Sequence, residues 1–428
     1  MRVLIFEPRY KGHHFMYVRR LLDALAGLAS EIIIATEPAS AQSIEFHQHL
    51  DDASTPYRLY DRLTPAPVAS KQHFWQQHLW LRLGQLRDAI SELRPDHVYI
   101  PTADGLASLT GVPFIPWWFH LSRHIPIEAN LLRCAFAYPT SEGKQRLKYR
   151  LLRATAARSC LTQLHTLDFI ARENLQRLHP ALAQRLSILP DPLDPVPSWP
   201  KIQARRELGL PEEGRYIGSV GTFEPRKGIE PLLAAFVKAT ADEGDRMLLV
   251  GKFDAAIRRN VDERYAELRR TKRLFLMDEY VTDRQLSMAL SAMDVVAAPY
   301  VRHIGPSGIV LRALAAGRRV LVSDYGWCGQ VVPRFDLGWA CDTQNEAVFT
   351  ASIQQALRQV DAGEFTLTPL QQKLLRFSSP DNFAMIWRAR LRARLGLPTE
   401  QDLLEWHEVV AGMESAPVTG LHVGTKSL

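Results

Sequence analysis

The amino-acid sequence predicts an α/β protein built from two doubly wound parallel sheets. Two stretches, one from residue 2 and one from residue 216, repeat an apolar strand, a glycine-containing loop, an amphipathic helix and a second apolar strand. Between them, residues 190–200 read PDPLDPVPSWP and have neither helical nor strand periodicity. A chain of 428 residues also exceeds what one ordinary hydrophobic core holds. Two domains joined by a proline-rich linker are therefore expected.

These features predict four regions along the chain. The first Rossmann-like domain is expected at residues 1–192 and the second at residues 193–375. Residues 376–413 have a helical pattern that is interrupted near Pro380. Residues 414–428 are small and polar, so we expect a disordered tail.

Composition excludes several classes of protein. Apolar residues make up 46% and charged residues 23% of the chain, a balance typical of soluble globular proteins. No apolar run approaches the roughly 20 residues that span a bilayer, and the first residues lack the pattern of a signal peptide. We therefore expect a cytoplasmic protein. The four cysteines are widely spaced and form no CxxC pair, which disfavours structural zinc and a disulfide framework.

The net charge of +6 favours anionic partners. Sugar nucleotides and an anionic membrane surface both fit this charge. Nucleic acid is the least favoured partner, because the basic residues are dispersed and no nucleic-acid-binding motif is present.

The first doubly wound pattern opens with a strand at residues 2–6, a helix at 15–28 and a strand at 32–35. The loop between the first strand and the helix contains Gly12, His13 and His14. Ligands of such sheets bind at the carboxyl ends of the strands, so these three residues are candidate binding residues. The alternative interpretation is a plain polar loop.

Two further segments of the first domain carry candidate functions. A strand predicted at residues 113–116 precedes His120, which is either a site residue or a structural histidine. Residues 143–158, GKQRLKYRLLRATAAR, form a basic amphipathic segment. It either lies on an anionic membrane surface or covers the core as a solvated helix.

The second pattern places a loop, GTFEPRKG at residues 221–228, between a strand at 216–220 and a helix at 229–239. Arg226 and Lys227 stand just before that helix. Two cations beside the free N–H groups of a helix N-terminus suit a diphosphate. Ordinary surface charge is the alternative.

A second loop of this kind lies within residues 295–329. A strand at 295–299 and a helix at 309–316 flank a loop with Gly305, Ser307 and Gly308, and another strand follows at 320–323. The helix N-terminus offers free N–H groups and a positive dipole end to a phosphate. Ser307 is expected to cap the helix through its side chain. In the alternative interpretation, Ser307 is only a cap and Gly305 only a turn residue.

These motifs resemble the GT-B glycosyltransferases, particularly family 4. The segment VGTFEPRKGIEPLL resembles that family's basic donor loop, and ALAAGRRVLVSDYG resembles the helix and strand behind the donor site. The resemblance implies two Rossmann-like domains facing a cleft, with the last helices crossing back to the first domain. It also implies transfer of a sugar from a nucleotide-diphosphate donor, usually with retention. We expect the acceptor to be a saccharide or lipid-linked, in cell-surface polysaccharide synthesis.

The chain departs from the family pattern at several positions. The family carries two glutamates separated by seven residues, and these positions hold Ile304 and Arg312 here. The family's arginine after the strand glycine is Thr222, whereas Lys227 matches the family's lysine. His303 begins the pattern H-x-G-x-S-G, which a subset of the family shares. The resemblance thus implies a phosphate cradle that is kept and a sugar and ribose site that is altered.

These observations assign residues to three roles. The expected catalytic residues are Arg226, Lys227 and His120. The expected donor-binding residues are Gly221, Thr222, His303, Gly305, Ser307, Gly308 and Arg312. The expected acceptor-binding residues are Gly12, His13 and His14. No cofactor and no metal are expected, since the chain has no DxD motif. The missing glutamates leave two alternatives, a catalytically silent sugar-nucleotide-binding partner of another transferase and a sugar-nucleotide epimerase on the same fold.

Overall fold

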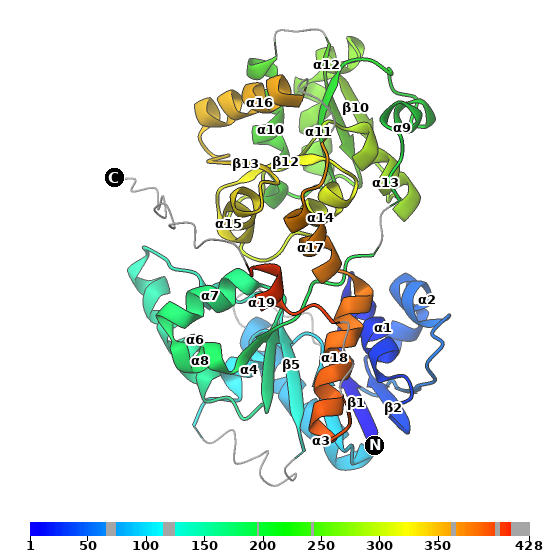
Figure 1. Ribbon diagram of the computed structural model, residues 1–428, viewed down its shortest axis with the longest axis vertical. Coiled ribbons are helices and arrows are strands. Elements are labelled where there is room, and N and C mark those ends of the chain that lie inside the picture. Colours follow the sequence, from blue (N-terminus) through cyan, green and yellow to red (C-terminus); the bar gives the residue numbers. More distant parts are fainter. Residues whose placement is uncertain are drawn as a thin grey trace. The chain divides into compact units, whose positions relative to one another are not determined.

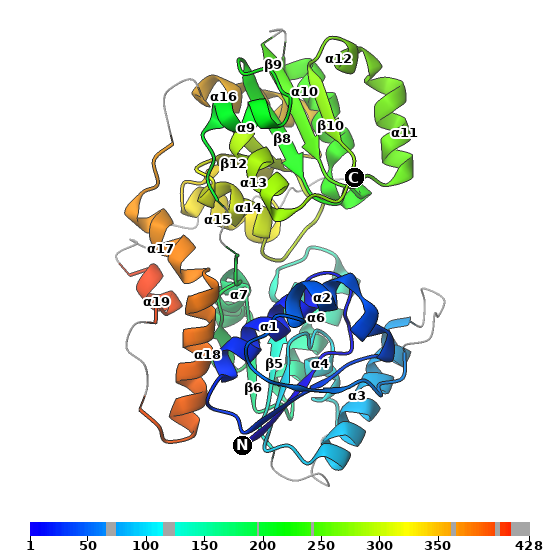
Figure 2. The ribbon, with the colours of Figure 1, turned by 90° about the vertical axis from the view of Figure 1, so that its right-hand side faces the viewer.

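The computed structural model describes residues 1–65, 74–113, 125–194, 197–240, 244–360, 365–398 and 403–411. These residues divide into two compact α/β units (Figures 1 and 2). Unit 1 contains residues 1–192 and 380–411, and unit 2 contains residues 193–379. Each unit is a parallel sheet covered by helices, so the predicted α/β class with two doubly wound sheets is confirmed. The tail predicted at residues 414–428 lies outside the described residues.

Unit 1 holds a parallel sheet that has seven strands among the described residues, in the order β3-β2-β1-β4-β5-β6-β7. The strands are β1 (Arg2–Phe6), β2 (Glu31–Ala35), β3 (Arg58–Tyr60), β4 (His97–Ile100), β5 (Ile127–Leu131), β6 (Gln163–Thr166) and β7 (Leu186–Ile188). The central strand β1 reads as a continuous apolar run, as expected for a strand covered on both faces. Its last four residues are all buried.

Helices cover both faces of this sheet (Figure 1). They are α1 (His14–Leu25), α2 (Ile44–Leu50), α3 (Phe74–Leu93), α4 (Leu106–Leu109), α6 (Gly143–Ala157), α7 (Phe169–Leu178), α8 (Pro180–Gln184), α18 (Pro380–Arg394) and α19 (Trp406–Val409), with 3-10 turns at Pro38–Gln42 and Ala135–Ala137. The C-terminal helix α18 packs along α1, as both ribbon views show. Arg388 of α18 donates to the carbonyl oxygen of Ala26, 2.6 Å away, just after the end of α1. A segment from the far end of the sequence thus belongs to the unit that contains the first strand.

Unit 2 repeats the plan, with six parallel strands among its described residues in the order β10-β9-β8-β11-β12-β13. The strands are β8 (Arg215–Val220), β9 (Asp245–Val250), β10 (Leu274–Met277), β11 (Val295–Ala298), β12 (Arg319–Ser323) and β13 (Gly338–Cys341). The helices are α9 (Lys201–Glu207), α10 (Ile229–Ala239), α11 (Ala255–Arg264), α12 (Ala266–Arg270), α13 (Asp283–Ala292), α14 (Gly308–Ala315), α15 (Gly326–Arg334), α16 (Glu346–Val360) and α17 (Pro369–Phe377), with a 3-10 turn at Pro225–Lys227.

The strand order places two pairs of loops side by side. In unit 1 the chain runs outward from β1 to β3 and then returns to the other side of β1 with β4. In unit 2 it runs from β8 to β10 and returns with β11. Open parallel sheets bind ligands at the carboxyl ends of the strands where the order reverses. The ends of β1 and β4, and those of β8 and β11, are therefore the positions to examine.

None of the described helices combines the length and apolar character that a bilayer crossing requires.

Candidate functional site

In unit 2, the loop of residues 221–228 after β8 (the β8 loop) is fixed to the loop of residues 299–307 after β11 (the β11 loop). Gly228 has φ +68°, and a Cβ there would lie 2.1 Å from the carbonyl oxygen of Pro299. The N–H of Val301 donates to the carbonyl oxygen of Arg226 at 2.8 Å. Only glycine allows this close backbone approach. The two loops therefore form one rigid edge at the reversal point of the sheet.

The two cations of the β8 loop, Lys227 and Arg226, have different partners. The Nζ of Lys227 lies 4.1 Å from the centroid of the Tyr300 ring, a cation–π distance. Lys227 makes no ion pair within the described chain, so its charge is oriented but not neutralised. Arg226 is half-exposed and its Nε contacts Glu224 Oε2 at 3.1 Å. Thr222 is exposed. Lys227 is therefore better positioned than Arg226 to meet a ligand anion.

Ser307 occupies the N-cap position of α14, but its side chain does not cap the helix, so that expectation was wrong. Thr282 and Thr368, at the same position of their helices, do cap through their side chains. The residue is 4% exposed, and its Oγ is buried and has no partner in the described chain. An unpaired buried hydroxyl costs about 1–3 kcal/mol, so such groups need an explanation.

Backbone donors surround the same hydroxyl. Within the described chain, no hydrogen bond is made by the backbone N–H groups of Gly305, Ser307, Gly308 and Ile309. They stand at the N-terminus of an eight-residue helix, where the dipole is positive. The hydroxyl and these amides together form a cradle for an anion, which a phosphate group fits.

The first residues of α15 contact the backbone of the β11 loop and fix its conformation. Gly326 has φ +67°, and a Cβ there would lie 2.3 Å from the carbonyl oxygen of His303. The N–H of Trp327 donates to the carbonyl oxygen of Ile304 at 2.9 Å. The His303 ring lies 3.3 Å, through Nε2, from the carbonyl oxygen of Pro306. The predicted pattern from His303 to Gly308 is thus brought together in one folded loop.

The sequence did not single out Tyr300 or Gly326, although both support this site. Tyr300 was identifiable only as an aromatic residue at a strand end, and Gly326 as a glycine after the next strand. Arg312 lies one turn into α14, is half-buried and has no partner in the described chain. Its guanidinium therefore pairs with no acidic neighbour among these residues, which agrees with its expected role toward the donor.

In unit 1, the predicted residues Gly12, His13 and His14 follow β1, and the structure adds two partners that the sequence did not reveal. Thr102, which follows β4, donates its hydroxyl to the buried carboxylate of Glu7 at 2.6 Å. His14 Nδ1 lies 3.0 Å from the Thr102 hydroxyl and 3.4 Å from Glu7 Oε2. Because the hydroxyl proton goes to Glu7, the hydroxyl oxygen must accept from His14 Nδ1–H. His14 is then the tautomer whose Nε2 accepts a hydrogen bond.

The His13 ring stacks on the His14 ring, with centroids 5.3 Å apart. Its partial removal from water, together with His14 and Arg133, lowers the pKa of His13 to about 4, although part of the side chain still reaches solvent. His13 is therefore neutral at pH 7. Gly12 has φ +85°, and its N–H donates to Glu45 Oε1 at 3.0 Å, which fixes the loop.

His120 belongs to residues 114–124, which lie outside the described residues, as does most of the strand predicted at 113–116. Among the described side chains, no group of three or more His, Cys, Asp and Glu is arranged to hold a metal ion.

Comparison with known proteins found a matching family model and a curated relative. Residues 214–359 match the family model described as "Glycosyl transferases group 1". The phosphatidyl-myo-inositol mannosyltransferase of Mycolicibacterium smegmatis is 37% identical over 136 residues, which is 30% of this chain and 33% of that protein. The match thus spans about a third of this curated relative.

Solved structures agree on the fold over most of the chain. A sucrose-phosphate synthase from Thermosynechococcus elongatus superposes with a TM-score of 0.66 at 17% identity, covering 92% of this chain and 99% of that one. Anabaena HepE in complex with UDP-glucose superposes with a TM-score of 0.61 at 14% identity, covering 92% and 100%. The fold is therefore that of the GT-B glycosyltransferases.

Proposed function

We propose that this chain, whose residues 214–359 match the model of the group 1 glycosyl transferases, transfers a sugar from a nucleotide-diphosphate donor to a saccharide or lipid-linked acceptor. We assign the reaction to cell-surface polysaccharide synthesis, with retention at the anomeric carbon. The observation that carries the proposal is the anion cradle of unit 2, in which the buried Ser307 hydroxyl and adjacent free amides stand beside the Lys227 loop.

In this proposal, the donor diphosphate lies against the cradle. The free amides of the β11 loop and the Ser307 hydroxyl donate to phosphate oxygens, and Lys227 neutralises the charge that grows on the departing diphosphate. Groups fixed before the reaction stabilise such a charge without reorganisation, and one such donor is worth about 2.7–4 kcal/mol in a measured case. No metal or cofactor enters the step, so EDTA is expected to leave turnover unchanged.

The relatives suggest which donors to test first. The HepE structure holds UDP-glucose, and the curated relative is named a mannosyltransferase. UDP- and GDP-sugars are therefore the first candidates.

On the acceptor side, we assign His14 Nε2 the task of accepting a hydrogen bond from the attacking hydroxyl. Glu7 and Thr102 hold the tautomer that this requires. Gly12 and His13 then shape the entrance beside it. Orientation of the attacking group is a large part of what a transferase active site supplies.

Arg312 favours one competing function, a sugar-nucleotide binder that does not catalyse transfer. Its guanidinium has no partner in the described chain and stands where the resemblance implies a glutamate. Donor binding without turnover on any acceptor would support the binder, and turnover would eliminate it. Product analysis in the absence of an acceptor separates the third candidate, an epimerase.

A panel of UDP-, GDP- and dTDP-sugars with acceptor extracts tests the proposal. The variants Lys227→Ala and Ser307→Ala are each expected to lower kcat by about 10²–10³, the range seen on removal of one stabilising donor. Arg270→Gln, on the exposed surface of α12, is the matched control and should leave kcat unchanged. If both site variants turn over at the wild-type rate, the site assignment is wrong.

We further propose that unit 1 rests on the anionic inner face of a cytoplasmic membrane through α6. From residue 143 to residue 158 there is no acidic residue. Leu147 and Leu151 are 61% and 58% exposed and lie one turn apart. The exposed cations Lys144, Lys148 and Arg150 flank them. An apolar pair between cations is the pattern of a helix that lies in the membrane interface. This membrane contact brings the enzyme to lipid-linked acceptors.

A further inference from the structure

We propose that a cavity at the amino edge of the unit 2 sheet binds a small organic phosphate, of the chemical class of a phosphorylated sugar. The cavity has a volume of about 960 Å³, within the usual range for small-molecule sites. It is bounded by the first residues of β8 and β12 and by the segments that precede β11 and β13. Strands of a parallel sheet begin at this edge, so the cavity lies opposite the β8 and β11 loops. The inference does not rest on the proposed transferase activity.

The charges that line the cavity are unbalanced. Its cationic residues are Lys201, Arg215, Arg318 and Arg319, and its acidic residues are Asp294 and Asp336. Four cations against two carboxylates leave a surplus of two positive charges. A phosphate monoester carries about that charge with the opposite sign near neutral pH.

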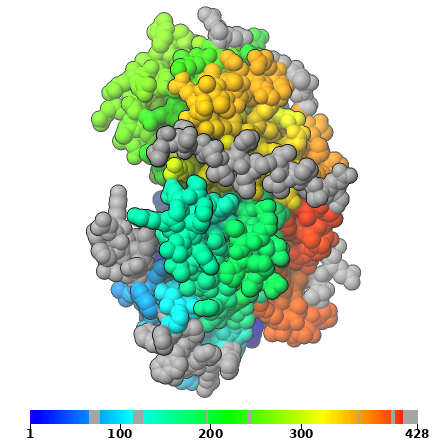
Figure 3. All heavy atoms as spheres, turned by 90° about the vertical axis from the view of Figure 1, so that its left-hand side faces the viewer, coloured from blue at the N-terminus to red at the C-terminus, as the bar shows by residue number. Residues whose placement is uncertain are grey.

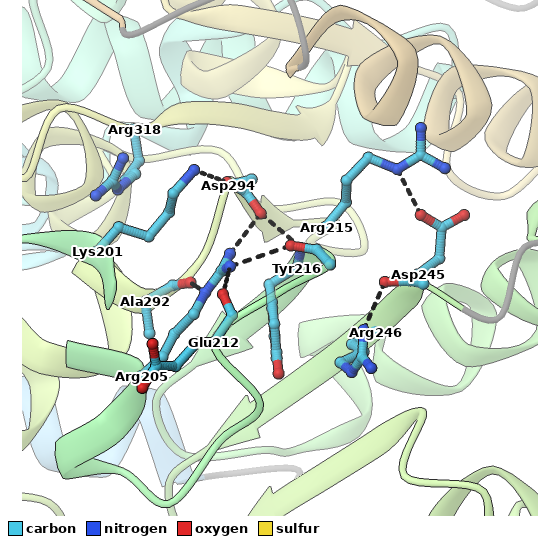
Figure 4. A network of polar contacts seen from close by, with 12 residues as sticks. Lys201, Arg205, Glu212, Arg215, Tyr216, Asp245, Arg246, Ala292, Asp294 and Arg318 are labelled. Carbon is cyan, nitrogen blue, oxygen red and sulfur yellow. Dashed lines mark hydrogen bonds and ion pairs between the residues drawn. The ribbon is translucent and has the colours of Figure 1, made fainter. Parts of the chain in front are cut away.

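The buried carboxylate of Asp294 divides its two oxygens between different partners (Figure 4). One oxygen, Oδ2, accepts from Arg205 and from the N–H of Tyr216, each at 2.7 Å. Arg205 is itself buried and bonds three backbone carbonyl oxygens. Lys201 Nζ contacts the other oxygen, Oδ1, at 2.7 Å while its side chain remains 41% exposed. The Lys201 ammonium therefore retains donors that can face the cavity.

Arg319 is also only weakly neutralised. Its NH1 lies 3.3 Å from Asp336 Oδ1, and the Asp336 side chain is 72% exposed. Exposed pairs of this kind contribute about 0–1 kcal/mol. The guanidinium lies 4.8 Å from the centroid of the Phe365 ring, which holds it at the cavity wall. Arg215 binds Asp245 through Nε at 2.7 Å (Figure 4), on the same side of the sheet.

A purely structural role, the binding of helix C-termini, explains some of the cations around the cavity but not all of them. The amino edge of the sheet receives the C-termini of the helices, which attract cations. Arg318 serves this role, since its NH2 donates to the carbonyl oxygen of Ser291 in the last turn of α13 at 2.8 Å. Arg205 does the same at Ala292. Among the described residues, Lys201 and Arg319 make no such carbonyl contact, so these two cations remain available to another anion.

The uncharged residues that line the cavity indicate which organic group is attached to the phosphate. Two aromatic residues, Trp199 and Phe365, and four neutral polar side chains line the cavity. The polar side chains are Ser198, Gln359, Thr366 and Thr368. Hydroxyl and amide groups pair with sugar hydroxyls, and an aromatic face covers the C–H face of a sugar ring. This combination fits a phosphorylated sugar better than phosphate alone.

Calorimetric titration with glucose 6-phosphate, inorganic phosphate and glucose tests the inference. Glucose 6-phosphate should bind, inorganic phosphate should bind more weakly, and glucose should not bind. Hydrogen exchange with glucose 6-phosphate present should protect residues 198–201, 214–215 and 317–319 and leave residues 303–308 unchanged. Protection confined to residues 303–308 would assign the phosphate to the cradle of the β11 loop and overturn the inference.

Paired variants separate binding from folding. The double variant Lys201→Gln/Arg319→Gln should weaken glucose 6-phosphate binding at least tenfold, because Asp294 keeps Arg205. Asp336→Asn should tighten it, since a repelling carboxylate is removed, and a folding defect would not tighten binding. Arg259→Gln/Arg270→Gln, on exposed helices of unit 2, is the charge-matched control for the double variant. Equal affinity in the wild type and the double variant, or no binding of glucose 6-phosphate to the wild type, rejects the site.

Discussion

The imidazole of His14 shows how much of the chemistry is decided by single hydrogen bonds. Its Nδ1 faces the Thr102 hydroxyl, and that hydroxyl already donates to the buried Glu7. The side chain of His14 is 12% exposed, so it has little freedom to turn. A free histidine exchanges between two tautomers, whereas this one is held with Nε2 as the acceptor. The proposed contact with an acceptor hydroxyl depends on that restriction.

Substitution of Glu7 by glutamine tests the restriction directly. The glutamine amide can donate to the Thr102 oxygen, which turns the hydroxyl proton toward His14 and places the other proton on Nε2. We therefore expect Glu7→Gln to lower sugar transfer nearly as much as His14→Ala, by about 10²–10⁴ if His14 takes part in proton transfer. Donor binding, measured by titration, should persist in both variants because the cradle lies in unit 2. His47→Gln, on an exposed part of α2, is the control. Wild-type transfer by His14→Ala would remove this residue from the mechanism.

At the scale of elements, periodicity predicted those with a clear local pattern. The predicted strand at 2–6 and the predicted helix at 229–239 agree with the observed bounds, and the helix predicted at 309–316 begins and ends one residue earlier. Helices α11 and α12 were not predicted, because between them they bury only Ile257, Val261 and Leu268. Local sequence carries little signal for such polar helices.

The candidate site was predictable only where it has a clear local sequence pattern. Each loop of the cradle follows a strand and precedes a helix, so both were visible in the sequence, and the rule for doubly wound sheets brings them together. The contact between Glu7 and Thr102 spans 95 residues and follows from the pairing of β1 with β4. The Ser307 hydroxyl is left unpaired in the folded loop, although a serine at an N-cap position usually caps its helix. Neither is encoded in a short motif.

One buried carboxylate helps to attach α18 to the first sheet. Glu128 of β5 contacts His165 Nε2 at 2.8 Å, His97 Nε2 at 3.3 Å and Arg394 of α18. Burial alone would raise the pKa of Glu128, but the hydrogen bond from His165 and the nearby His97 ring outweigh it and hold the pKa well below its usual range. The group is therefore ionised in the folded protein.

We expect Glu128→Gln to loosen α18, because three partners then surround a neutral amide. Removing one member of a buried ionic cluster costs about 3–5 kcal/mol. Urea denaturation should give a lower free energy of unfolding for unit 1, and hydrogen exchange in residues 380–394 should become faster. Glu267→Gln removes an exposed carboxylate that pairs with Arg270 on α12, and its effect should stay below about 1 kcal/mol. Unchanged exchange in α18 would show that apolar packing alone holds it.

At the scale of the whole molecule, the excess of basic residues is not spread evenly. The chain has 52 lysines and arginines against 46 acidic residues, yet the α6 helix carries no acidic residue at all. The segment that includes α6, coloured teal to green, forms part of the unit 1 surface in Figure 3. A cationic surface with an exposed leucine pair differs from an ordinary solvated helix, because exposing a pair of apolar side chains to water is unfavourable.

Sedimentation with lipid vesicles distinguishes membrane binding from a solvated surface. The wild-type protein should bind vesicles with about 30% anionic lipid at low salt, since each cation near such a surface contributes about 1 kcal/mol. Binding should fall as salt screens the charges. Lys144→Glu/Lys148→Glu should abolish binding, and Leu147→Ser/Leu151→Ser should weaken it at every salt concentration.

Arg259→Glu/Arg270→Glu makes the same change in net charge on exposed helices of unit 2. If net charge alone caused the attraction, this control would lose binding to the same extent as the α6 double variant. If the control binds as the wild type does while both α6 variants fail, the contact belongs to that helix. Equal retention of all four proteins on the vesicles would contradict the proposed membrane contact, and α6 would then only cover the core of unit 1.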